Sequence, residues 1–82
     1  MFEVKITINL KDGVSDPEGA NTLKALHLLG FENVKNAKTI RTFNLLIDGD
    51  NKNEIRKEVE KMCQRLLTNP VIHTYKIKIE EN

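Results

Sequence analysis

The sequence predicts an α+β fold of the ferredoxin-like sandwich type, with the element order β-α-β(β)-α-β. Three observations lead to this prediction: strictly alternating apolar and polar residues near the start, the same alternation near the end, and an amphipathic helix pattern before the last strand. Right-handed crossovers would place the two helices on one face of a mainly antiparallel sheet. We expect one domain spanning residues 1–82, because a chain of this length has no room for a second.

The first predicted strand covers residues 2–10. Its apolar residues alternate with polar ones, which is the period of a half-buried strand. The apolar set is Phe2, Val4, Ile6, Ile8 and Leu10. This is the clearest strand signal in the sequence.

A helix is predicted from residue 17 to about residue 29. Asp16 can cap it by accepting a hydrogen bond from an unpaired backbone N–H, and Pro17 suits the first helical position. Gly30 supplies the permissive conformation after the last turn. One side of this helix carries Ala20, Leu23, Leu26 and His27.

Residues 34–48 are predicted to be extended, as one long middle strand, either continuous or bent, or as two strands. Phe43, Leu45 and Ile47 share one face of it. The β-branched residues Thr39 and Ile40 also favour extended backbone.

The second helix is predicted to begin after Asn51, which forms a variant capping box with Glu54. Pro70 ends it, since a proline disfavours helical backbone at the preceding residue. Its expected buried stripe consists of Ile55, Val59, Met62, Cys63, Leu66 and Leu67. A final strand follows, in which Tyr75, Ile77 and Ile79 alternate with charged residues.

Composition and charge exclude several classes of function. Lys and Arg number 13 against 12 Asp and Glu, so no strong affinity for nucleic acid is expected. No run of about 18 apolar residues occurs, and the first residues do not have the pattern of a secretion signal. The single cysteine cannot form an internal disulfide. We therefore expect a cytoplasmic protein without a membrane segment.

No catalytic, cofactor or metal site is predicted. Val59 occupies the position at which a calcium loop beginning at Asp48 would need its bidentate Glu. His27 and His73 lack a positioned partner, and Cys63 lies on an apolar helix stripe. The four glycines match no phosphate-binding loop.

Two stretches of the chain together resemble the PurS family. The first runs Leu-Lys-Asp-Gly-Val-Ser-Asp-Pro-Glu-Gly over residues 10–19, and the second runs from Cys63 through Asn69-Pro70-Val71-Ile72 to Tyr75. The chain departs from the family pattern at Ser15, at Glu18 and at Ile40, where the family has a glycine. A β-branched residue at position 40 disfavours a bulge there.

The resemblance implies a non-catalytic accessory subunit of the formylglycinamidine ribonucleotide (FGAM) synthase complex of purine biosynthesis. Such a subunit bridges a glutaminase subunit and a larger ATP-dependent synthase subunit, and supports ammonia transfer between them. It implies a homodimer, or dimers paired into a tetramer. It also implies no cofactor for this chain, with ATP and Mg²⁺ used by the synthase partner.

The candidate partner-contacting residues are those whose identity the predicted elements do not require. They are Asp16, Pro17, Glu18, Gly19, Lys38, Arg41, Asn69 and Pro70. Each has a structural alternative as a cap, a solvated charge or a helix stop. Two other functions stay open at this point: a ferredoxin-like regulatory module that binds a small ligand between protomers, and a small enzyme that uses His27 or His73.

Overall fold

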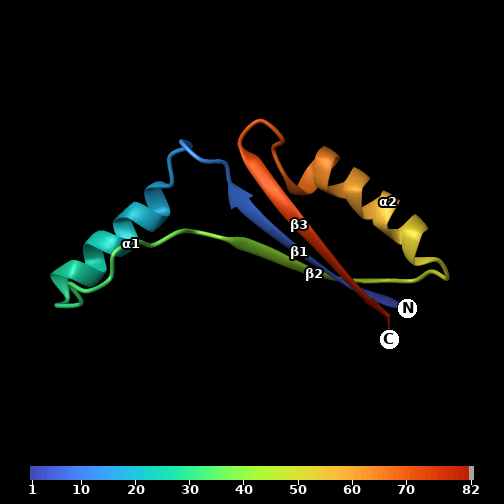
Figure 1. Ribbon diagram of the computed structural model, residues 1–82, viewed down its shortest axis with the longest axis horizontal. Helices are drawn as coiled ribbons and strands as arrows, with labels where there is room; N and C mark the ends of the chain where they lie inside the picture. Colours follow the sequence, from blue (N-terminus) through green and yellow to red (C-terminus); the bar gives the residue numbers. More distant parts are fainter. Residues whose placement is uncertain (82) are drawn as a thin grey trace.

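The computed structural model describes residues 1–81; the predicted domain, residues 1–82, ends one residue beyond that part, at Asn82. The predicted α+β class, with an antiparallel sheet and two α-helices, is confirmed (Figure 1). The elements follow in the order β1 (Phe2–Leu10), α1 (Pro17–Leu28), β2 (Arg41–Ile47), α2 (Lys52–Met62), the π-helical turn η1 (Cys63–Leu67) and β3 (His73–Glu81).

The sheet has three strands in the order β2-β1-β3, and both pairings are antiparallel. The strongly alternating β1 is therefore the central strand. Val4 lies opposite Leu45 on one side and Ile79 on the other, so the apolar positions of all three strands share one face. The even-numbered residues of β1 face α2, and its odd-numbered residues line the opposite, open face of the sheet.

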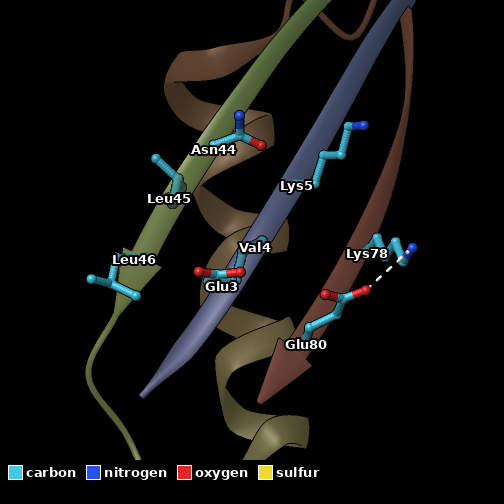
Figure 2. A pocket seen from close by; sticks show the side chains of 8 residues that line it. All are labelled: Glu3, Val4, Lys5, Asn44, Leu45, Leu46, Lys78 and Glu80. Carbon is cyan, nitrogen blue, oxygen red and sulfur yellow. Dashed lines mark ion pairs between the residues drawn. The ribbon is translucent and has the colours of Figure 1, made fainter. Parts of the chain in front are cut away.

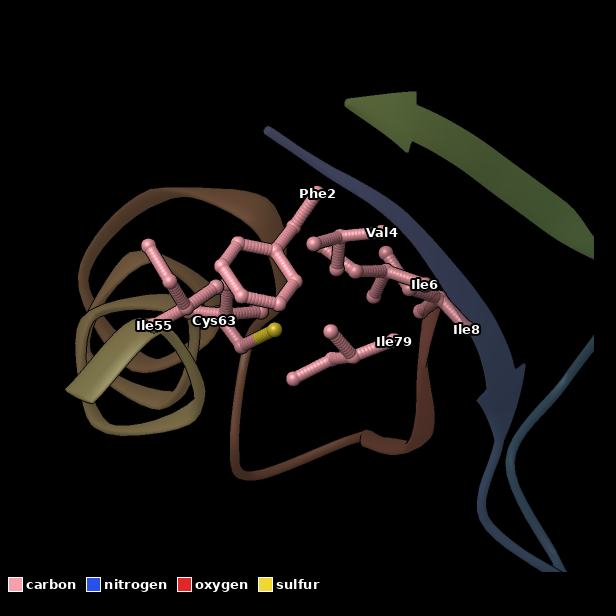
Figure 3. Close-up of a cluster of buried hydrophobic side chains, with 8 residues drawn as sticks. Phe2, Val4, Ile6, Ile8, Ile55, Cys63 and Ile79 are labelled. Carbon is pink, nitrogen blue, oxygen red and sulfur yellow. The ribbon is translucent and has the colours of Figure 1, made fainter. Parts of the chain in front are cut away.

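The core lies between this apolar face and α2 (Figure 3). Ile6 and Val59 are fully buried there. Burying one such side chain contributes about 1.5–3 kcal/mol to folding. The buried set is Phe2, Val4, Ile6, Ile8, Ile55, Val59, Cys63 and Ile79.

Helix α1 does not lie on the sheet of its own chain but extends beyond the sheet's end (Figure 1). The sequence predicted two helices on one face of the sheet, but within this chain only α2 lies there. The molecule measures 51 × 28 × 14 Å, with a radius of gyration of 16.4 Å. A compact domain of this length would have a radius of gyration of about 12 Å. We call α1 and the residues that return from it, 17–40, the arm.

The middle strand is shorter than the predicted extended segment, residues 34–48. Regular pairing with β1 begins at Arg41, and residues 35–40 run back along the arm outside any strand. Their strand propensity is not sufficient, because a strand needs a neighbour to pair with and β1 turns away at Leu10. The backbone N–H of Thr39 instead donates to the carboxylate of Asp16.

The second helix also ends differently from its pattern. The last turn, η1, is π-helical, and the N–H of Thr68 donates to the carbonyl of Cys63, five residues earlier. In a regular α-helix Leu66 would lie on the buried stripe with Ile55 and Val59. The wider π turn places Leu67 there instead, and the prediction that Leu66 is buried is wrong: its side chain is exposed.

No helix in residues 1–81 combines the length and the apolar character that crossing a bilayer requires.

Candidate interaction sites at the base of the arm

The arm is joined to the rest of the chain by the carboxylate of Asp16. One oxygen accepts the N–H of Gly19 at 3.0 Å, which caps α1 as predicted. The other accepts the N–H of Thr39 at 2.8 Å, which ties the return segment to the start of the helix. Both hydrogen bonds lower the pKa of Asp16 below its ordinary value, and the bond from Thr39 has the larger effect.

Position 19 has no room for a side chain, so it requires glycine. A Cβ atom there would lie 2.5 Å from the carbonyl oxygen of Ala37 and 2.5 Å from a carboxylate oxygen of Asp16. The absence of a side chain lets the return segment pass directly against the first turn of α1. Asp16 and Gly19 therefore fix the direction in which the arm leaves the sheet.

The far end of the arm is closed by His27. Its Nε2 lies 2.7 Å from the carbonyl oxygen of Val34, to which it donates. Gly30, with φ of 99°, turns the chain out of the helix in the left-handed conformation that glycine adopts readily. The histidine holds the loop, a structural task.

The second family stretch folds into a tight turn, residues 69–73, which we call the Asn69 turn. The side-chain oxygen of Asn69 accepts the N–H of Val71 at 3.0 Å. The N–H of Asn69 donates to Nδ1 of His73 at 2.8 Å, so that nitrogen carries no proton. His73 is thus held as part of this turn.

Lys11 connects the two family stretches. Its backbone N–H donates to the carbonyl of Ile72 and its ammonium group to the carbonyl of Pro70, both at 2.8 Å. Sequence reasoning missed this role. The only available signal was that the lysine belongs to the first family stretch. The pattern did not indicate that its ammonium group would bind the carbonyl of a residue 59 positions away.

Two of the eight predicted residues lie at one surface hollow of about 300 Å³. Asp16 and Lys38 line it, together with Lys11, which carries the link to Pro70. Six predicted residues are not among the lining residues: Pro17, Glu18, Gly19, Arg41, Asn69 and Pro70. Pro17 is the first residue of α1, Glu18 is exposed in its first turn, and Arg41 is exposed at the start of β2.

A second hollow, of about 530 Å³, lies on the open face of the sheet (Figure 2). Its charges lie in two rows across the strands, with Glu3 opposite Glu80 and Lys5 opposite Lys78. Lys78 and Glu80 form an ion pair at 3.2 Å, with both side chains mostly exposed. An exposed pair of this kind adds little stability.

The remaining reactive groups are engaged in the core. Tyr75 donates its hydroxyl to Glu60 at 2.6 Å, and this bond to a carboxylate raises the pKa of the tyrosine. Burial raises the pKa of the Cys63 thiol, which disfavours the nucleophilic thiolate. Residues 1–81 hold no cluster of three or more side chains suited to a metal ion.

Comparison with known proteins places this architecture in a family. The family model described as "PurS: Phosphoribosylformylglycinamidine (FGAM) synthase" matches residues 3–81. The subunit PurS of phosphoribosylformylglycinamidine synthase from Methanocaldococcus jannaschii is 44% identical over 81 residues, covering 99% of this chain and 98% of that protein. The corresponding Bacillus subtilis subunit is 32% identical, covering 99% and 95%.

Solved structures agree with the sequence relatives. The crystal structure of Methanocaldococcus jannaschii PurS superposes with a TM-score of 0.91 at 43% identity, over 100% of this chain and 99% of that one. A chain in the structure of PurLQS from Thermotoga maritima matches with a TM-score of 0.86 at 26% identity, over 96% of each chain. The chain therefore belongs to the PurS family, and it is a subunit of FGAM synthase in purine biosynthesis.

Proposed function

We propose that the chain is a non-catalytic accessory subunit that bridges the glutaminase subunit and the ATP-dependent synthase subunit of FGAM synthase and supports ammonia transfer between them. The similar chain in the structure of PurLQS supports membership of such a complex. The side chains that could perform acid–base chemistry, His27 and His73, hold backbone groups in place. The chain needs no cofactor of its own in this proposal, and ATP and Mg²⁺ are used by the synthase partner.

The observation that carries the proposal is the arm, whose apolar surface the chain leaves uncovered. Leu28 is 79% exposed and Leu29 74% exposed, and Phe31 and Ile40 are more than half exposed. Several large apolar side chains exposed on one element are typical of a protein interface. We assign the surface that covers it to a second copy of the chain, in a homodimer or in dimers paired into a tetramer.

The sheet offers a matching surface for that second copy. Phe43, Leu45 and Ile47 of β2 lie on the same face as the core but are only half-buried, because α2 packs towards β3. An arm from a partner protomer laid over this strip would supply the second helix of the ferredoxin-like layer. Two such contacts, related by a two-fold axis, would be equivalent.

The two edges of the sheet support the same assignment. β3 carries Lys76, Lys78, Glu80 and Glu81, and charges on an edge strand oppose pairing with another chain. β2 has one charged residue, Arg41, at its first position. The β2 edge is therefore the side of the sheet suited to contact with another protomer.

Reconstitution of the synthase reaction tests the proposal. The synthase and glutaminase subunits would be assayed with and without this chain, using either glutamine or free ammonia as the nitrogen source. We expect the chain to be required for the glutamine-dependent rate and to have little effect on the ammonia-dependent rate. A full glutamine-dependent rate from the two larger subunits without it would refute the bridging role.

A pair of helix variants separates the arm's surface from its fold. Leu28→Gln with Leu29→Gln changes exposed apolar residues, whereas Lys24→Gln changes an exposed polar residue of the same helix. We expect the double variant to weaken self-association at least about tenfold, as loss of a buried apolar contact does. Lys24→Gln should leave self-association unchanged.

A further inference from the structure

The open face of the sheet carries an ordered pattern of charge. Its acidic row consists of Glu3 and Glu80, which lie directly opposite each other on β1 and β3. Its basic row, two positions further along β1, consists of Lys5 and Lys78, which are also direct neighbours. All four side chains are exposed and line the same hollow, seen in Figure 2 with α2 behind the sheet. The two rows therefore form one contiguous surface.

This pattern is unfavourable in an isolated sheet. Like charges placed directly opposite each other on neighbouring strands destabilise the pairing of those strands. Lys78 and Glu80 relieve part of the repulsion through their ion pair along β3, at 3.2 Å. Within residues 1–81, Glu3 and Lys5 of the central strand form no ion pair. Opposite charges supplied from outside the sheet would therefore stabilise both rows.

A second copy of the same face has the charge pattern that would neutralise this one. The two-fold axis that relates the copies would run across the strands, between the two stacked sheets and between the two rows. It places Glu3 over Lys5 of the other copy and Glu80 over Lys78 of the other copy. Stacked sheets lie about 10 Å apart, a distance that long side chains from both sheets can bridge. The open face is therefore self-complementary, as a two-fold contact requires.

The β2 side of the open face fits the same arrangement. Leu46 lies beside Glu3 and is 63% exposed, and Asn44 lies beside Lys5. The same axis places Leu46 against Asn44 of the other copy, so the leucine is covered without facing a charge. Each copy thus adds a neutral contact next to the charged one.

We propose that the open face pairs two dimers of this chain into a tetramer, with the acidic row of one copy against the basic row of the other. This inference rests on the proposed homodimer, which uses the arm, and it names the surface of the second contact. Three strands about 4.8 Å apart, with about 3.4 Å per residue, give the open face roughly 400 Å². A standard interface buries about 800 Å² on each partner. One open face is thus too small to hold two single chains, whereas the two open faces of a dimer together reach this size.

Charge reversal in the full-length chain tests this assignment. Glu3→Lys/Glu80→Lys makes both rows basic, and Lys5→Glu/Lys78→Glu makes both rows acidic. Each variant alone should raise the dissociation constant of the tetramer into dimers at least about tenfold in sedimentation equilibrium, because like charges then face each other. Formation of the dimer itself should not change. An undiminished tetramer in both variants overturns the assignment.

Mixing the two variants gives the sharpest measurement. A basic face and an acidic face are complementary, so an equimolar mixture should recover tetramers that contain both variants, which native mass spectrometry identifies by mass. A misfolded variant could not produce this result, and circular dichroism checks the fold of each variant. A mixture that stays dimeric contradicts the assignment.

A matched control changes the same charge elsewhere. Lys57→Glu/Lys61→Glu alters two exposed lysines of α2, which lies on the other side of the sheet. This variant should form tetramers as the wild type does. A loss of tetramers equal to that of Lys5→Glu/Lys78→Glu would mean that net charge, and not the pattern on the open face, controls the pairing of dimers.

Ionic strength separates the two contacts without any substitution. Salt screens exposed charges, so high salt should dissociate tetramers of the wild-type chain into dimers. The apolar contact of the arm should hold the dimer under the same conditions. A tetramer that is insensitive to salt would contradict a contact made by rows of charge.

The remaining outcomes separate this inference from the function on which it rests. A wild-type chain that forms dimers but never tetramers refutes the open-face contact and leaves the arm contact standing. A wild-type chain that stays monomeric refutes both contacts. If charge reversal leaves tetramers intact but abolishes glutamine-dependent activity in the reconstituted synthase, the open face contacts a larger subunit and the assignment is wrong.

Discussion

The two halves of this molecule are built differently. The half formed by β1, β3 and α2 folds on itself: Phe2, Ile6 and Val59 are almost wholly enclosed by neighbours from the same chain. The arm has a similar share of apolar residues, yet Leu28 and Leu29 project from it uncovered. What holds the arm is a small set of hydrogen bonds around Asp16 and His27.

This difference shows that order and burial are separate properties here. The first half is ordered because apolar side chains leave water together, and this driving force has no preferred direction. The arm is ordered by directional polar contacts, which set its direction relative to the sheet without burying its apolar side chains. A structure of the second kind suits a surface that another protein must meet in a defined position.

The largest effect is expected from a change in the self-folded half. Ile6→Ala removes a fully buried side chain from the central strand and should lower the free energy of unfolding by about 2–5 kcal/mol. Denaturant titration at fixed protein concentration measures it. A loss below about 1 kcal/mol would mean that the core does not carry the stability of this half.

A smaller effect is expected where the arm meets the sheet. Gly19→Ala places a Cβ atom against the carbonyl of Ala37 and the carboxylate of Asp16. Overpacking of this kind costs about 1–3 kcal/mol. Hydrogen exchange should show faster exchange at Thr39, with β1 and β3 unchanged. The neighbouring exposed change Glu18→Ala is the control, and equal effects of the two substitutions would contradict the role of Gly19.

The hydrogen bond between Tyr75 and Glu60 tests whether polar contacts matter in the self-folded half as well. Tyr75→Phe removes the donor and should cost about 0.5–1.5 kcal/mol in unfolding free energy. Thermal unfolding monitored by circular dichroism gives the value. Self-association should be unaffected, and a change in it would mean that Tyr75 also acts at an interface.

Acidification should act on the arm before it acts on the core. The folded-state pKa of Asp16 is lowered, so its contribution is fully present above the unfolded-state value of about 3.9 and is lost as pH falls through the lower folded-state value. Hydrogen exchange at the amides of Gly19 and Thr39 should accelerate in that acid range. Asp16→Asn should remove this pH dependence, and a dependence that survives in the variant would assign it to another group.

Much of the fold could be predicted because its signals are local. The alternation of β1, the Asp16–Pro17 helix start and the Asn51 cap each depend on residues close in sequence, and the structure places each as expected. The position of Leu66 could not be predicted in the same way. Its periodicity is that of a buried residue, and the π turn that exposes it depends on a bond between Thr68 and Cys63 that no pattern indicates.

The candidate site was predicted in part. Asp16 was correctly expected to cap a helix, but its second bond, to Thr39, joins residues 23 positions apart. The contact between Lys11 and Pro70 spans a still greater separation. The position of α1 could not be predicted either. The sequence pattern of a helix that covers a sheet is the same whether the sheet belongs to its own chain or to another.

Sedimentation equilibrium of the wild-type chain tests the central claim most directly, namely that the arm is a surface for a second copy. At micromolar concentration we predict a dimer or a higher assembly, and we predict that Leu28→Gln/Leu29→Gln shifts it towards monomer while Lys24→Gln does not. A wild-type chain that remains monomeric over this range, with the arm still protected from hydrogen exchange, would contradict the claim.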